Sequence, residues 1–78
     1  MFSEREEEIL KVLGRRRMTL RVIADELFDN EYERPMEPEI TVGNSIRRII
    51  KKCEHHQLKW TLVRKKTNGR LTIWRISI

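Results

Sequence analysis

The stretch TVGNSIRRIIKKC, residues 41–53, limits the possible folds more than any other part of this chain. Its apolar residues recur at spacings of i, i+4, i+7, i+8 and i+11, which places them on one face of an α-helix. Since valine and isoleucine are weak helix formers, burial against the rest of the chain must stabilise this helix. The sequence therefore predicts a helix over residues 41–56, with Thr41 as its N-cap and with one apolar and one cationic face. The apolar residues are Val42, Ile46, Ile49, Ile50 and Cys53.

A first helix is predicted over residues 3–14. Ser3 and Glu6 match the S-x-x-E capping box, in which each side chain accepts a hydrogen bond from an amide at the helix start. Gly14 is suited to end this helix. The acidic residues of the first turns complement the helix dipole, which favours a solvated face over a metal or partner site. These acidic residues are Glu4, Glu6, Glu7 and Glu8.

A second helix is predicted over residues 20–29, with Thr19 as its N-cap. Met18, just before that cap, is also suited to a short strand pairing. The segment 30–40 is predicted to be an acidic loop, because two prolines interrupt the helical pattern there. This loop lacks the ligand spacing of a calcium site. The prolines are Pro35 and Pro38.

The end of the chain has the pattern of a β-hairpin over residues 59–77. The Asn-Gly pair at residues 68–69 favours a type I′ turn, which needs positive φ at both central positions. In that register the numbers of paired residues sum to 137, so Val63 faces Trp74. We expect Trp74 to lie in the core. For Trp60, on the other face, the alternatives are packing on the helices, a dimer interface and stacking on an unpaired base.

Charge is distributed unevenly along the 78 residues, which carry a net charge of +5. Residues 1–40 hold 7 Lys/Arg and 11 Asp/Glu, a net charge of −4, whereas residues 41–78 hold 10 Lys/Arg and one acid, a net charge of +9. Such polarity indicates a face that binds a polyanion. Nucleic acid is favoured over anionic lipid and over an acidic protein, and a basic surface without a partner is the remaining alternative.

The composition disfavours several classes of function. No run of about 18 apolar residues predicts a membrane span, and the N-terminus lacks the pattern of a secretory signal. The single cysteine suits the cytoplasm, and a chain this short suits a viral or plasmid gene. Cys53, His55 and His56 are too few for a structural zinc site, and no nucleophile–base set is present. We therefore expect no enzyme activity, no cofactor and no metal.

The order of helix, helix, loop, helix and hairpin resembles a winged helix-turn-helix domain over nearly all of residues 1–78. MTLRVIADEL (residues 18–27) resembles the first helix of the helix-turn-helix pair, and TVGNSIRRIIKKC resembles the recognition helix. GRLTIWRI (residues 69–76) resembles the second wing strand. The acidic, proline-containing loop departs from the family, which usually has a shorter turn there. The resemblance implies an α+β fold, a single small domain of three helices followed by a C-terminal hairpin wing.

This resemblance implies a protein that binds double-stranded DNA at specific sequences, which we expect to be a small transcriptional regulator. Helix 41–56 is expected to enter the major groove, which is wide enough to admit an α-helix. The wing tip, residues 64–70, is expected on the DNA backbone or in the minor groove. Expected contacts with bases come from Gly43, Asn44, Arg47 and Arg48. Expected phosphate or backbone contacts come from Arg21, Thr41, Ser45, Lys51, Lys52, Lys65, Lys66 and Arg70, and also from Arg15, Arg16 and Arg17.

Two other functions remain open. One is a protein-interaction module that uses the acidic N-terminal half and the 30–40 loop, in particular Glu31, Glu33 and Glu37. The other is a replication or recombination accessory protein that binds DNA without a preferred site. We expect a monomer or homodimer that is nucleoid-associated if the source is prokaryotic. We expect no membrane contact, because the apolar face of helix 41–56 has the rest of the chain to pack against.

Overall fold

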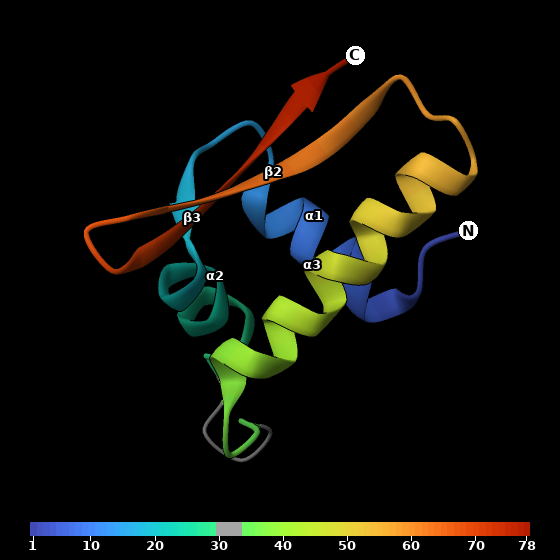
Figure 1. The fold of residues 1–78 in the computed structure, drawn as a ribbon. Helices are drawn as coiled ribbons and strands as arrows, with labels where there is room; N and C mark the ends of the chain where they lie inside the picture. Colours follow the sequence, from blue (N-terminus) through green and yellow to red (C-terminus); the bar gives the residue numbers. More distant parts are fainter. Residues whose placement is uncertain (30–33) are drawn as a thin grey trace.

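Three helices and a small antiparallel sheet make up the described part of the chain, residues 1–29 and 34–78, in a computed structural model (Figure 1). The sheet comes from the C-terminal part of the chain, apart from one short strand that precedes the second helix. The fold is therefore α+β, as predicted. In chain order the elements are α1 (Glu4–Leu13), β1 (Met18–Thr19), α2 (Leu20–Leu27), α3 (Pro38–His55), β2 (Trp60–Thr67) and β3 (Arg70–Ser77).

Helix α1 begins and ends at its predicted caps. The Glu6 amide donates to the Ser3 hydroxyl at 3.2 Å, and the Ser3 amide donates to the Glu6 carboxylate at 3.1 Å, so the capping box is complete. Gly14 follows the helix with a φ of +54°, a conformation that residues with a side chain rarely adopt. The prediction of this helix from its caps is confirmed.

Helix α2 begins at its predicted cap but ends two residues earlier than position 29. The Thr19 hydroxyl accepts a hydrogen bond from the Val22 amide at 3.2 Å. After Leu27 the backbone leaves the helical region, with a φ of −111° and a ψ of 55° at Phe28. The Phe28 side chain is only 5% exposed, so the residue that ends the helix belongs to the core.

Helix α3 starts three residues before Thr41, which was predicted to be its N-cap. Glu37 is the N-cap and makes no side-chain capping bond, and Pro38 occupies the first turn. Proline fits that position because an amide there has no partner within the helix and because its φ is already helical. Thr41 lies inside the helix, where its hydroxyl donates to the Glu37 carbonyl at 3.2 Å. The predicted start of this helix was therefore wrong.

Strands β2 and β3 form the predicted hairpin, and β1 pairs with the other side of β3. Val63 lies opposite Trp74, so the predicted register is confirmed. The turn residues at positions 68 and 69 have φ values of +52° and +77°, the sign that a type I′ turn requires. Met18 pairs with Ile73, which confirms the short strand and ties the start of α2 to the hairpin.

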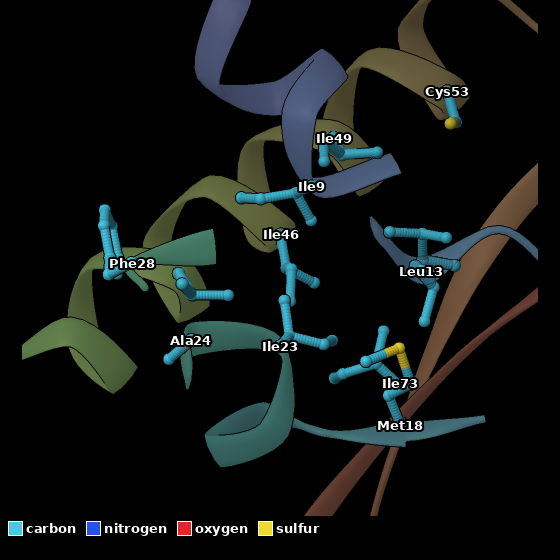
Figure 2. Close-up of a cluster of buried hydrophobic side chains, with 12 residues drawn as sticks. Ile9, Leu13, Met18, Ile23, Ala24, Phe28, Ile46, Ile49, Cys53 and Ile73 are labelled. Carbon is cyan, nitrogen blue, oxygen red and sulfur yellow. The ribbon is translucent and has the colours of Figure 1, made fainter. Parts of the chain in front are cut away.

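The core lies between the three helices and one face of the sheet (Figure 2). Ile46 of α3 lies between Ile9 of α1 and Ile23 of α2, and all three side chains are completely buried. Leu62 and Ile73 of the hairpin belong to the same cluster. The apolar stripe of α3 is thus buried as its spacing predicts.

The two tryptophans lie on opposite faces of the hairpin, but the buried face is not the one predicted. Trp60 packs against the core, with its ring centroid 5.8 Å from that of Phe2 and the Arg75 guanidinium 4.0 Å from its centroid. Trp74 lies half-buried on the outer face, where the Arg17 guanidinium covers its ring at 4.4 Å. The prediction of Trp74 as a core residue was wrong, because both hairpin faces are apolar and contact with the helices decides which one is buried.

Replacing a buried and an exposed isoleucine of α3 tests which face of the helix is internal. Ile46 is completely buried, so we expect Ile46→Ala to lower the free energy of unfolding by about 2–5 kcal/mol. Ile40 is 56% exposed, so we expect Ile40→Ala to change it by less than about 0.5 kcal/mol. Denaturant unfolding of both variants measures the difference, and equal losses would contradict the assignment of the two faces.

Candidate nucleic-acid interface

The outer stripe of α3 carries three of the four predicted base-reading residues in exposed positions. Asn44, Arg47 and Arg48 are all exposed, and Lys51 continues the stripe one turn further. Among the described residues, the three cations of this stripe take part in no ion pair. Their charges therefore face solvent and are open to an anionic ligand.

The early start of α3 adds a turn to this stripe. Glu39 and Ile40 are both exposed on the added turn, although neither was predicted to be a site residue. They were missed because the helix was expected to begin at Thr41. The preference of proline for the first turn of a helix is the signal that would have found them.

The hairpin tip lies beside the start of α2 and the first turns of α3, and reaches past α2 in Figure 1. Arg64 of β2 and Arg47 of α3 line one hollow on this side of the molecule. Arg21 of α2 lines a second hollow with Lys66 and Arg70 of the tip. Three elements thus contribute cations to one region: Arg21 from α2, Arg47 from α3, and Arg64, Lys66 and Arg70 from the hairpin. Arg48 and Lys51 of α3 and Lys65 of the hairpin are also exposed but line neither hollow.

Gly43, the fourth predicted base-reading residue, lies one turn before Arg47 on α3 and lines the same hollow. A Cβ atom at this position would meet the Leu20 side chain at 3.8 Å, an ordinary van der Waals contact. Packing within the protein therefore does not require glycine here. Gly43 is half-buried and lines this hollow, so its backbone is partly accessible from outside.

Two predicted phosphate contacts on α3 do not fit the positions of their side chains. Ser45 is only 4% exposed because it falls on the inner side of the helix. Thr41 is half-buried, and its hydroxyl is engaged with the Glu37 carbonyl. The spacing of the apolar residues alone did not predict the burial of these two polar residues, because both lie at the edge of the buried stripe.

Lys52, another predicted phosphate contact, is also engaged within the fold through its ammonium group. Its Nζ lies 2.6 Å from Oε1 of Glu6, whose side chain is only 3% exposed. Burial of the Glu6 carboxyl disfavours its charged form. Hydrogen bonds from Lys52 and Ser3, together with the charge of Lys52, outweigh this effect and lower the pKa of Glu6 below its ordinary value of 4.5. Glu6 is thus a buried anion that joins α1 to α3, not part of a solvated acidic face.

The arginines between α1 and β1 lie away from the hairpin tip. Arg16 pairs with Glu26 at 3.1 Å, and Arg17 covers Trp74. Arg15 lines a hollow with residues from the opposite end of the hairpin, including Arg75. These arginines are therefore not part of the region around the first turns of α3.

Other candidate sites are accounted for by packing. Cys53 is 2% exposed, and burial raises the pKa of its thiol, so it is a small core residue. Residues 1–29 and 34–78 contain no group of three or more potential metal ligands. No helix in the same ranges is long and apolar enough to cross a membrane. Glu31 and Glu33, suggested as a partner contact, lie outside the described residues.

The Glu6–Lys52 pair predicts a pH-dependent loss of stability in Lys52→Met. At pH 7 we expect the free energy of unfolding to fall by about 1–3 kcal/mol, because the buried carboxylate loses its cation. Since the folded state lowers the pKa of Glu6, the stabilisation is present above 4.5 and is lost as the pH falls through the lower folded value. The difference in the free energy of unfolding between wild type and Lys52→Met should therefore become smaller as the pH falls.

Lys51→Met is the matched control, because it removes the same charge from the next residue of α3, which is exposed. We expect its free energy of unfolding to stay within about 0.5 kcal/mol of wild type. Denaturant unfolding from pH 3 to pH 7 measures both variants. The Glu6–Lys52 pair would contribute no stability of its own if both substitutions lowered the free energy of unfolding equally. The same would follow if the loss in Lys52→Met did not change with pH.

Comparison of the chain with protein-family models, with curated proteins and with solved structures gives no match.

Proposed function

We propose that this protein is a winged helix protein that binds double-stranded DNA at specific sequences, with α3 as its recognition helix and the β2–β3 hairpin as its wing. The observation that carries the proposal is the convergence of exposed cations from α2, α3 and the hairpin tip around the first turns of α3. Cations from separate elements on one surface match the regular charge of a duplex backbone better than a single charged helix does. A small transcriptional regulator is the role that this binding mode fits best.

The shape of α3 supports docking in the major groove. Its 18 residues correspond to a length of about 27 Å, and the groove is about 12 Å wide. Arginine pairs with the O6 and N7 atoms of guanine, and asparagine with the N6 and N7 atoms of adenine. Arg47 or Arg48 therefore suits a guanine, and Asn44 suits an adenine. Lys51, one turn further along, suits a phosphate.

The hairpin supplies contacts of a different kind. Lys65, Lys66 and Arg70 are exposed at the tip. Flexible cationic side chains bind phosphate without regard to sequence. The wing therefore adds affinity on the DNA backbone or in the minor groove, and α3 adds the preference for a sequence.

Salt dependence of DNA binding tests the electrostatic part of the proposal. If the protein neutralises about six phosphates, log K against log salt concentration falls with a slope near −5. We expect the double variant Lys65→Gln/Lys66→Gln to weaken binding to all sequences alike and to reduce the magnitude of the slope by about 2. The double variant Lys11→Gln/Lys59→Gln removes the same charge from exposed positions outside the proposed interface and should keep the slope.

A flat salt slope for the wild type would overturn the proposal. Selection of binding sites from random duplexes, run beside the titration, tests the sequence preference. Equal affinity for all sequences would instead favour a replication or recombination accessory protein. If the protein does not bind duplex DNA at all, the alternative of a protein-interaction module is favoured.

Gly43→Ala separates the stability of α3 from its docking. Because the new Cβ meets only the Leu20 side chain at 3.8 Å, we expect the helix to gain up to about 1 kcal/mol from the better helix former. Affinity for the selected site should fall at the same time, since the methyl group lies where the backbone approaches DNA. Thermal unfolding and a binding titration on the same sample measure both effects, and higher stability with unchanged affinity would exclude Gly43 from the contact.

A further inference from the structure

Glu39 is an acidic residue in the middle of the cationic region. It lines the hollow formed with Arg21, Lys66 and Arg70, and also the hollow formed with Arg47 and Arg64. No other acidic residue of the described chain lines either hollow. Within 4.0 Å its carboxylate forms no ion pair with a described residue.

The position of Glu39 in the helix explains only part of this arrangement. As a residue of the first turn of α3, it interacts favourably with the helix dipole. The same carboxylate also lowers the positive potential of the surface and repels a phosphate brought against it. The interaction with the helix dipole therefore comes at the expense of attraction to DNA.

The chemistry of the major groove supplies a role for this carboxylate. The N7 and O6 atoms of guanine, the O4 atom of thymine and the phosphate oxygens are all acceptors, so they repel a carboxylate. The N4 amino group of cytosine is a donor, and a glutamate side chain is a matching acceptor. The N6 amino group of adenine is also a donor, but it lies beside the N7 acceptor, which repels a carboxylate. A carboxylate on the reading face therefore favours a cytosine over an adenine and penalises contacts with guanine, thymine and phosphate.

We infer that Glu39 is a specificity-determining residue that accepts a hydrogen bond from the N4 amino group of a cytosine and weakens binding to other sequences. This inference rests on the proposed function, because it assumes that the first turns of α3 face bases. The other charged side chains that line the two hollows attract any duplex, whereas Glu39 is unfavourable to sequences without a matching donor. Specificity often depends on such unfavourable contacts with the wrong partner.

Glu39→Gln tests the inference by site selection and by affinity for the wild-type site and for random duplexes. We expect the variant to lose the preference for cytosine at one position and to discriminate there about tenfold less. Its affinity for random duplexes should rise several-fold. Glu39→Asp keeps the charge but shortens the side chain, so it should lose the cytosine preference with little gain in affinity for random duplexes.

Glu37→Gln is the control, because Glu37 is exposed, makes no capping bond and lines neither of the two hollows. It removes the same charge and should keep the cytosine preference. If Glu39→Gln and Glu37→Gln raise affinity for every sequence equally, Glu39 acts only through net charge and the inference is wrong, although DNA binding stands. If the wild type binds no duplex, the proposed function itself fails.

Discussion

The burial of the inner stripe of α3 is the constraint on which the rest of the structure depends. Val42, Ile46 and Ile49 are completely buried against α1, α2 and the sheet, so the helix cannot rotate without exposing them. Because an α-helix has 3.6 residues per turn, fixing this stripe also fixes which residues face outward. Asn44 and Arg47 are exposed as a direct consequence. The surface proposed to read DNA is therefore the reverse side of the core.

The Glu6–Lys52 pair then limits the extent of that surface. The same carboxylate oxygen accepts from the Ser3 amide and from the Lys52 ammonium, so one buried side chain caps α1 and ties it to α3. Among the described residues, Lys52 is thereby paired within the fold, unlike the other cations of α3. The cations that line the two hollows lie toward the first turns of α3, next to the hairpin tip and the start of α2. An acidic residue, Glu39, within that region is what suggests selectivity beyond attraction to any polyanion.

Local features of the sequence were sufficient to predict much of the fold. The capping box and the Asn-Gly turn at residues 68–69 depend on neighbours in sequence, so both the first helix and the hairpin register were confirmed. The start of α3 was missed because Pro38 was read as a helix breaker, and Glu39 was missed with it. The partner of Lys52 and the packing of Trp60 instead of Trp74 against the core depend on contacts between distant elements, which periodicity does not encode.

The contact surface itself can be mapped by NMR, with 15N-labelled protein titrated with a duplex obtained by site selection. We expect amide shifts to change on residues 39–51 of α3, at the start of α2 and at the hairpin tip, residues 64–70, while those of α1 stay unchanged. The largest changes should fall at Asn44 and Arg47. Changes concentrated on α1, or on the acidic residues before Pro38, would contradict the claim that the outer face of α3 docks on DNA.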